Sequence, residues 1–537
     1  MADRKRIVAA LAVFALALLL RLWFLLDLKD HPYFEHLMID SASYDRWAGR
    51  IADGDFWGSR VFYQAPLYPY FLGGLYALFG RDLTVVRVAQ AALGSVTCVL
   101  LFLLGARLFT FRTGLLAGVL AALYSTFIFQ DQMILKSVVV FFFLSLSLLR
   151  LARWADSGGW PALGAAGFLF GVAISGRGNL LFAVPFVTLW ILARGVRPFR
   201  GSSIRTAGVF LLGGALAIAP VTLRNRIVGG DWVMTESDAG INVYVGNNPA
   251  ATGIHTPPFT IRTVPEYEER DAAKLAEQEL GRRPLKPSEV SRFWIAKAVR
   301  FAILNPGAEA KLVGRKFLLA WNDREVPDNY DQAYFARVSP LFRGFLPSFV
   351  WVSPFAVLGM VVSLRDWRRT GFLHLFVIAY ILSLLALYVT SRYRLPVVIG
   401  LVPFAAHGAL WFGGRLRGRS WGAAGSGAIL LVLVFLLGKI SLLEEEGFAK
   451  QEAEIATFYA DDGDVEEAER AFERAIGEGR GSANLHLVYM NQGMFYARLG
   501  QTGRAAEAFR NALRVNPAFT PALLELEKLT AGAAATP

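Results

Sequence analysis

One acidic residue stands at the start of the first long polar segment of the chain. Asp40 precedes the run Ser41-Ala42-Ser43-Tyr44, which begins a stretch with helical character. An aspartate in this position commonly caps a helix by accepting a free backbone N–H. The same carboxylate could instead act as a general base that takes a proton from a hydroxyl nucleophile. The sequence leaves both interpretations open.

A second acidic residue lies between two apolar runs. Asp131 sits in Phe129-Gln130-Asp131-Gln132, and Lys136 and Ser137 enter the following run. A carboxylate here can simply mark the end of an apolar segment. Ionisable groups within a membrane also tend to face a polar cavity, where Asp131 would be a second catalytic group.

Several arginines interrupt the apolar runs or stand at their ends. Each one alone is typical of a side chain that reaches from an apolar segment to water. Together they come from segments that are far apart in sequence. The guanidinium group presents a planar fork of donors that suits phosphate, so we expect a lipid phosphate or pyrophosphate headgroup as ligand. These residues are Arg21, Arg177, Arg224, Arg226, Arg392 and Arg394.

The segment 242–253 is rich in residues that favour turns. Its pattern predicts a strand followed by tight turns. Its Asn and Tyr side chains, with Asn247 among them, would also suit recognition of hydroxyl groups. The six histidines show no spacing typical of metal ligands, so the sequence predicts no metal site.

The elements that must position these residues are membrane helices. The chain is 55% hydrophobic and 18% charged, whereas soluble chains have roughly 25% charged residues. Repeated apolar runs of about 20 residues predict an all-α polytopic bundle. The runs lie at about 7–27, 84–107, 113–130, 132–151, 160–175, 178–193, 204–223, 346–364, 371–389, 393–413 and 423–441.

The net charge of +12 does not point to nucleic acid, because Lys and Arg form short blocks between apolar runs. Eleven spans with the N-terminus inside place these blocks on one side. The long segments 28–83 and 224–345 then face outside. Two stretches, 66–80 and 308–321, are too short or too charged to span and are predicted as interfacial helices. The composition suggests a bacterial inner membrane, with the outer segments in the periplasm.

The C-terminal segment 446–537 has a soluble composition and contains a repeat at an offset of 37 residues. Small residues and aromatics recur in register, which is typical of tetratricopeptide repeats, although a plain helical hairpin is the simpler alternative. Residues 521–530 are predicted to form a capping helix. The matched positions are Ala456, Tyr459, Gly463, Ala468, Phe472 and Ala475 with Gly493, Tyr496, Gly500, Ala505, Phe509 and Ala512.

The part up to about residue 440 resembles the GT-C superfamily of membrane glycosyltransferases, close to the protein O-mannosyltransferases and the lipid A aminoarabinose transferase. The resemblance defines a domain over 1–443. It is carried by Asp40 with Tyr44, Gln64-Ala65-Pro66-Leu67-Tyr68-Pro69, Arg177-Gly178-Asn179, Arg224-Asn225, Gly246-Asn247-Asn248-Pro249 and Arg392-Tyr393-Arg394-Leu395-Pro396.

The resemblance implies an enzyme that takes a sugar from a polyprenyl-phosphate donor, inverts the anomeric centre and uses an acid in the first outer loop, here Asp40. Protein O-mannosyltransferases have Asp-Glu where this chain has Asp40-Ser41. Many relatives have an acid where this chain has Lys136-Ser137, so a second acidic role falls to Asp131. Combined with the residue patterns, substrate-binding roles are expected for Tyr44, Tyr63, Gln64, Lys136, Arg177, Asn179, Arg224, Asn247, Arg392, Tyr393 and Arg394.

The acceptor could be a protein, a lipid or a glycan, and the repeats could recruit it. A divalent metal could assist, although no ligand set is visible. Two other functions stay open at this point. One is a membrane scaffold that displays the repeats, and the other is a ligase or polymerase of lipid-linked oligosaccharides.

Overall fold

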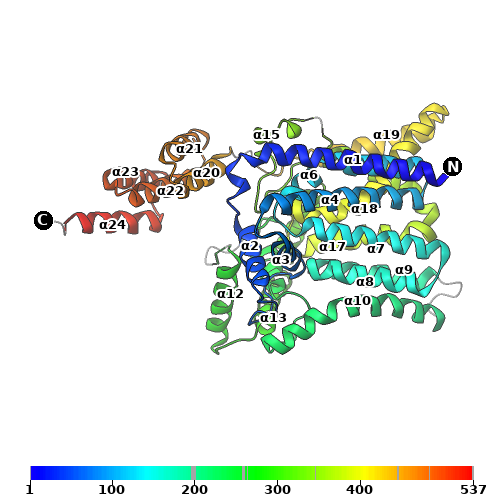
Figure 1. The fold of residues 1–537 in the computed structure, drawn as a ribbon, viewed down its shortest axis with the longest axis horizontal. Helices are drawn as coiled ribbons and strands as arrows, with labels where there is room; N and C mark the ends of the chain where they lie inside the picture. The colour runs from blue at the N-terminus through cyan, green and yellow to red at the C-terminus, as the bar shows by residue number, and fades with distance from the viewer. Residues whose placement is uncertain are drawn as a thin grey trace. The chain divides into compact units, whose positions relative to one another are not determined.

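Every regular element of the chain is a helix (Figure 1). The structure is a computed structural model that describes residues 2–194, 201–256, 261–262, 264–344, 346–443, 447–482 and 484–534. No strand occurs within these ranges. The all-α fold predicted from the periodicity of apolar residues is therefore confirmed.

Helices coincide with all of the predicted apolar segments. Seven stretches are long and apolar enough to cross a membrane, or eight if the pair α5–α6, bent by 54°, is one span. The multi-pass membrane protein is thus confirmed, whereas the predicted count of eleven crossings is not. The helices are α1 (Ala2–Lys29), α4 (Leu83–Leu108), α5 (Phe111–Leu123), α6 (Ser125–Gln132), α7 (Ser137–Ser157), α8 (Trp160–Gly176), α9 (Ala183–Arg194), α10 (Gly201–Gly229), α16 (Phe349–Ser363), α17 (Trp367–Ala386), α18 (Ser391–Arg417) and α19 (Trp421–Gly438).

The helices α4, α7, α8 and α10 lie side by side in one layer of the bundle (Figure 1). Glycines on α8 bring its backbone close to α10. A side chain at Gly167 would meet the backbone of Phe210, and one at Gly171 would meet the backbone of Gly214. Membrane helices commonly pack through such small residues, since apolar side chains gain little by leaving lipid for a helix interface.

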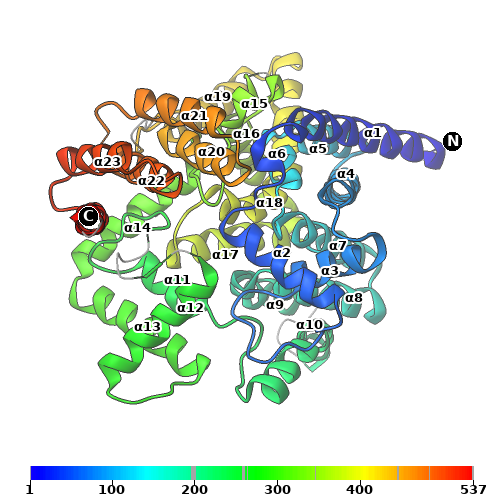
Figure 2. The same ribbon diagram turned by 60° about the vertical axis from the view of Figure 1, so that its left-hand side comes forward.

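The remaining helices of this unit gather at one end of the bundle, where α2, α3, α12 and α13 are labelled in Figure 1. Figure 2 shows α11, α12, α13 and α14 together on one side. The helices α3 and α14 occupy the two stretches predicted as interfacial. The elements are α2 (Ile39–Ala52), α3 (Leu67–Phe79), α11 (Ala239–Gly246), α12 (Pro265–Leu280), α13 (Pro287–Leu304), α14 (Pro306–Trp321) and α15 (Phe335–Val338).

One of the two interpretations of Asp40 is wrong. Asp40 is not the N-cap of α2: Met38 holds that position without a side-chain cap, and Asp40 lies in the first turn. Asp131 lies near the end of α6 with 2% of its surface exposed. Each of the two carboxylates pairs with an arginine from a distant segment.

The polar residues before the apolar run 393–413 and part of the segment 242–253 are also helical. Residues 391–394 open α18, where Thr390 caps the helix by accepting from the Tyr393 N–H at 3.3 Å. The strand predicted at the start of 242–253 is instead the helix α11. It packs against α13 so closely that a side chain at Gly240 would meet the backbone of Ser291. This packing overrides the weak local preference for an extended chain.

The chain divides into two compact units, residues 1–27 with 37–440 and residues 28–36 with 441–537. Residues 444–446, at the predicted domain boundary, lie outside the described residues. The second unit contains the paired helices of the predicted repeat and a final helix, and Gly493 lies against the Phe509 ring as the repeat pattern requires. Its helices are α20 (Ala449–Asp461), α21 (Val465–Glu478), α22 (Leu485–Arg498), α23 (Thr502–Val515) and α24 (Thr520–Ala534).

The segment 28–36 completes this second unit by packing on α20. The Tyr33 hydroxyl donates to Glu454 at 2.7 Å, and its ring meets Phe458 edge-on with centroids 5.5 Å apart. The His36 ring stacks on Phe458 at 4.6 Å, and its Nε2 lies 2.9 Å from an Asp462 oxygen. A piece of the first polar loop is therefore part of the repeat unit.

Candidate active site

Asp40 lies at the centre of a group of charged side chains that come from three segments. The Arg392 guanidinium donates through Nη1 to Asp40 Oδ2 at 2.6 Å and through Nε to Asp328 Oδ2 at 2.9 Å. These three side chains are between 7% and 14% exposed. Two carboxylates share one arginine, so this group carries a net negative charge in a largely buried place.

The second oxygen of Asp40 faces a different neighbour. Gln64 donates through Nε2 to Asp40 Oδ1 at 2.8 Å, and Ser43 donates to the Gln64 carbonyl at 3.0 Å. Burial by itself would raise the pKa of Asp40, but the positive charges of Arg392 and Lys136 lower that pKa below its usual value. The Asp40 carboxylate is therefore ionised at neutral pH.

More charge surrounds this group. Lys136 Nζ lies 3.7 Å from Glu236 Oε2, and the other oxygen of Glu236 accepts from the Gly178 N–H at 3.0 Å. Asp238 is half-buried, and burial followed by repulsion from Glu236 raises its pKa well above the usual value. Lys136 thus neutralises part of the negative charge of Glu236 and Asp238 near Asp40.

Arg177 is a buried cation without a hydrogen-bonding partner. Only 2% of the residue is exposed, and none of its three side-chain nitrogens makes a hydrogen bond with the described residues. The guanidinium carbon stands 4.9 Å from the centre of the Tyr393 ring. Beside it, Asn179 accepts from the Tyr380 hydroxyl at 2.9 Å. A desolvated guanidinium of this kind has donors available for an anion.

Two predicted tyrosines line the same region. Tyr44 is fully buried in α2 and its hydroxyl has no hydrogen-bonding partner within the described part of the chain, while its ring lies 5.4 Å from that of Tyr68. The Tyr63 hydroxyl donates to Glu268 Oε2 at 2.8 Å. Burial raises the pKa of Glu268 to about 7. This carboxyl is therefore partly protonated at neutral pH.

Asp131 and Arg394, two other predicted site residues, have partners outside the Asp40 group. Asp131 pairs with Arg21, whose Nε lies 2.7 Å from Oδ2, and both are buried in the helix bundle. Arg394 pairs with Glu325 at 2.6 Å and stacks 4.1 Å from the Phe349 ring. The catalytic role of Asp131 and the substrate-binding role of Arg394 stay predictions.

Arg224 and Asn247 are occupied by backbone groups. Arg224 donates to the carbonyls of Trp57 and Arg60 in the first outer loop and lies 3.8 Å from the Phe62 ring. Asn247 donates to the Ala386 carbonyl at 2.8 Å and accepts from Lys316 at 2.6 Å. These contacts fasten loops to the bundle, and the substrate-binding roles of both residues also stay predictions.

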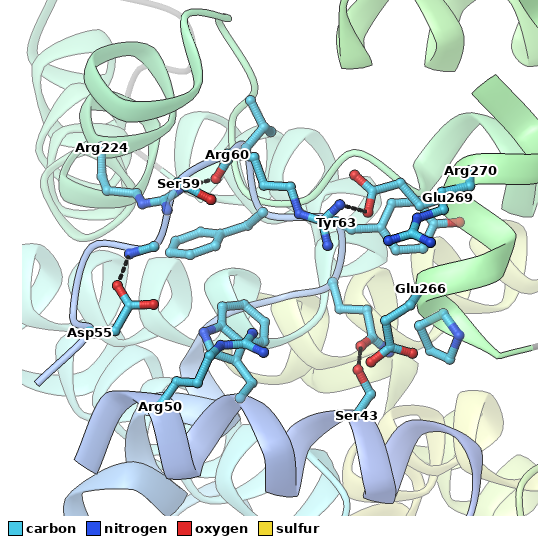
Figure 3. A pocket seen from close by; sticks show the side chains of 16 residues that line it. Ser43, Arg50, Asp55, Ser59, Arg60, Tyr63, Arg224, Glu266, Glu269 and Arg270 are labelled. Atoms are coloured by element: carbon cyan, nitrogen blue, oxygen red, sulfur yellow. Dashed lines mark hydrogen bonds and ion pairs between the residues drawn. The ribbon is translucent and has the colours of Figure 1, made fainter. Parts of the chain in front are cut away.

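Gln64, the partner of Asp40, also lines an open cleft of about 500 Å³, which Figure 3 shows. Figure 3 shows Arg60 paired with Glu269, and the distance between them is 3.0 Å. The lining is mostly polar. It includes Ser43, Trp47, Arg50, Asp55, Arg60, Phe62, Tyr63, Gln64, Arg224, Glu266, Glu269 and Arg270.

Sequence reasoning missed the partners that the outer segments supply. Asp328, Asn329, Glu236 and Glu268 all contact or influence predicted site residues. The cluster Asp328-Asn329-Tyr330-Asp331 was the available signal, because it is a dense polar group in a predicted outer loop. Within the described residues, no group of three or more His, Cys, Asp or Glu side chains is placed to hold a metal ion.

A bundle of apolar helices with a buried, charged group at one end defines a multi-pass membrane protein with a polar site. Residues 63–223 match the model of the dolichyl-phosphate-mannose-protein mannosyltransferase family, and residues 487–519 match that of the tetratricopeptide repeat. The first match covers less than half of the chain and agrees with the expected resemblance to the GT-C membrane glycosyltransferases. The second agrees with the expected tetratricopeptide repeats.

Solved structures show more distant similarity. The Archaeoglobus fulgidus oligosaccharyltransferase tethered to an acceptor peptide is 14% identical, with 87% of this chain covered and a TM-score of 0.44. This chain spans only 58% of that protein. ArnT from Cupriavidus metallidurans, bound to undecaprenyl phosphate, is 15% identical over 78% of this chain and 80% of its own, with a TM-score of 0.35. No curated protein sequence is significantly similar to the chain.

Proposed function

We propose that this protein is an inverting glycosyltransferase that moves a sugar from a polyprenyl-phosphate donor to an acceptor hydroxyl at the outer face of the membrane. The observation that carries the proposal is the position of Asp40. Its ionised carboxylate accepts hydrogen bonds from Gln64, which lines an open polar cleft, and from Arg392. The guanidinium groups of Arg392 and Arg177 both lie near the Tyr393 ring.

The two sides of Asp40 suit the two substrates. Oδ1 accepts from Gln64, which lines the cleft, so an acceptor hydroxyl that enters from the cleft would take the place of the Gln64 amide as hydrogen-bonding partner. Oδ2 faces Arg392, and the neighbouring Tyr393 ring separates Arg392 from Arg177. The donor phosphate would lie on this cationic side. A base next to the acceptor and cations next to the leaving group are the arrangement that an in-line displacement needs.

The reaction is a single displacement. Asp40 takes the proton of the acceptor hydroxyl while that oxygen forms a bond to the sugar C1. The bond between C1 and the phosphate oxygen breaks, and its electron pair stays with the departing polyprenyl phosphate. Because attack comes from the face opposite the phosphate, the anomeric centre is inverted. The proton, the sugar and the charge are all accounted for without a further reactant.

The leaving phosphate needs stabilisation of its growing negative charge. Arg177 offers donors that have no partner in the described residues, and Arg392 can turn from Asp40 towards the phosphate once Asp40 is protonated. Preorganised donors of this kind are worth a factor of about 10² to 10³ each in other enzymes. Lys136 stays paired with Glu236, and its positive charge also acts at the Asp40 site.

The location and the role of the repeats form part of the proposal. The basic blocks between the apolar segments support an orientation in which the Asp40 end faces the periplasm of a bacterial inner membrane. The repeats would present a binding groove for a protein partner, either an acceptor or a neighbour in the cell envelope.

Replacement of Asp40 tests the proposal. The full-length Asp40→Asn variant, in proteoliposomes with membrane-extracted polyprenyl-phosphate sugars, should lose transfer by roughly 10² to 10⁴-fold, because the acceptor loses its general base. Its thermal unfolding should stay close to that of the unchanged protein. Asp53→Asn is the matched control, since Asp53 is exposed at the other end of the same helix. Transfer at the normal rate by Asp40→Asn would exclude Asp40 as the base.

A further inference from the structure

Two cavities of opposite character share one wall in the membrane unit. The polar cleft of about 500 Å³ described above and an apolar groove of about 330 Å³ are both lined by Phe62 and Arg224. Each has the size of a typical small-molecule site, roughly 300 to 1,000 Å³. The Arg224 guanidinium lies 3.8 Å from the Phe62 ring, so these two side chains form the boundary between the cavities.

The apolar groove runs along membrane helices. Leu67 and Tyr70 come from α3, Val172 from α8, and Val221 from α10. Trp57, which is 66% exposed, stands at its outer end in the first polar loop. Tryptophan is enriched at the boundary between lipid and water. A hydrocarbon chain in this groove would therefore have its polar end at the level of the cleft.

Two arginines that line the cleft have no carboxylate partner within the described residues. Each of its carboxylates has a partner: Asp55 accepts from the Gly58 N–H at 2.9 Å, Glu266 pairs with Arg46 at 2.7 Å, and Glu269 pairs with Arg60 at 3.0 Å. Arg50 and Arg270 form no ion pair within the described part of the chain. An anionic headgroup would complement these two guanidinium groups.

One residue of the cleft contacts the proposed base. Ser43 and Gln64 line the cleft, and Gln64 donates to Asp40 at 2.8 Å. A headgroup hydroxyl that takes the place of the Gln64 amide would meet Asp40 Oδ1. The groove and the cleft adjoin at Phe62 and Arg224, so an apolar site lies next to a cationic one, as the chain lies next to the anionic headgroup in a lipid.

We propose that the acceptor is a membrane lipid with an anionic, hydroxyl-bearing headgroup, whose chain lies in the groove of α3, α8 and α10. This inference rests on the proposed function and names the substrate class for its acceptor side. The headgroup anion pairs with Arg50 and Arg270, and the hydroxyl meets Asp40 beside Gln64. The donor approaches from the side of Arg177.

Photocrosslinking tests lipid binding without any need for sugar transfer. The probe is phosphatidylglycerol with a diazirine in one acyl chain, present as a trace in proteoliposomes of phosphatidylcholine around the full-length protein. Mass spectrometry then locates the label. We expect several-fold more label at Val172 and Val221 than from phosphatidylcholine that carries the same diazirine chain. Equal labelling by the two lipids would show only the surrounding bilayer and would overturn the proposal.

Two sets of variants sharpen the result. Val221→Trp, which fills the groove, should abolish the selective label. Leu216→Trp should not, because Leu216 is exposed on the same helix and lines neither cavity. The double variant Arg50→Gln/Arg270→Gln should reduce groove labelling to the level of phosphatidylcholine. Selective labelling that survives both changes would overturn the proposal.

A competition experiment separates acceptor from donor. Unlabelled polyprenyl phosphate should leave the groove label in place, and displacement by it would assign the groove to the donor and overturn the inference. Asp40→Asn should label like the unchanged protein, because Asp40 is not needed for the chain to bind. Selective labelling together with an active Asp40→Asn enzyme would reject the base assignment alone and keep the lipid site.

Discussion

Arg392 donates to Asp40 at 2.6 Å and thereby joins the first outer loop to the helix α18 near the end of the bundle. The same guanidinium holds Asp328, so the arginine is shared between two carboxylates. An acid held in this way stays ionised but is a weaker base than a free carboxylate. Release from Arg392 as the leaving phosphate develops charge would strengthen Asp40 as a base at the moment when it accepts the proton.

Arg392→Gln should shift the pH dependence of the reaction. Loss of the cation raises the pKa of Asp40, so the acidic limb of the kcat/KM profile should move to higher pH. The variant should also lose about 3 to 5 kcal/mol of stability, because both carboxylates keep their largely buried position without the cation that they share. A pH profile of transfer and a thermal unfolding curve check the two effects. An acidic limb at its original pH would contradict the pairing as a determinant of basicity.

Arg177 and Arg394 should respond differently to replacement by glutamine. Arg177→Gln removes a buried cation that has no hydrogen bond in the described structure, so stability should be unchanged or higher while KM for the donor rises. Arg394→Gln leaves Glu325 buried without its partner and should cost about 3 to 5 kcal/mol. Thermal unfolding of both variants with donor titrations for Arg177→Gln checks this contrast. Equal destabilisation would show that Arg177 serves the fold.

Glu268 should make the protein less stable as the pH rises. Its pKa of about 7 lies above the ordinary value of 4.5, so the folded state binds the proton more tightly than the unfolded state. Its contribution is fully present below pH 4.5 and is lost as the pH rises through 7, by about 3 kcal/mol in total. Glu268→Gln should flatten this decline between pH 5 and 8 in thermal unfolding. An unchanged slope would assign the decline to other groups.

The pair of Arg21 and Asp131 offers a test of the predicted catalytic role of Asp131. Asp131→Leu alone should destabilise the bundle by about 3 to 5 kcal/mol, since Arg21 is left buried without its partner. The double variant Arg21→Met/Asp131→Leu should recover most of this loss. If the double variant folds and transfers sugar normally, Asp131 serves only the fold. Loss of transfer in a folded double variant would support the catalytic prediction.

Much of the fold could be predicted because apolar runs and basic blocks are local signals. All of the predicted membrane segments coincide with helices, and the register of small residues in the repeat agrees with the contact of Gly493 with Phe509. Fewer than eleven stretches in the described residues are long and apolar enough to cross a membrane. The reason is that α8 and α9 are short, and α16 and α17 follow each other almost directly.

The site was harder to predict because its contacts join distant segments. Asp40 looked like a helix cap from its neighbours, yet its partners are Gln64 and Arg392. Asp328 lies in a loop with no periodic pattern, and only the folded chain shows that it shares an arginine with Asp40. Local sequence reports helix ends and apolar faces. It does not report which buried charges meet.

The segment 28–36 changes what a deletion of the repeats would mean. Because this segment belongs to the same compact unit as 441–537, the chain passes between the two units three times, after residues 27, 36 and 440. A truncation at residue 440 would remove the contacts of Tyr33 and His36 with α20 and the residue that follows it. His36 is only four residues before Asp40 in the sequence.

Lost activity in such a truncation would therefore not by itself reveal a recruitment role for the repeats. The informative variant keeps α20 and changes only residues further along the repeat unit. The repeat unit is therefore not a separable appendage, because its fold includes residues 28–36 of the first outer loop.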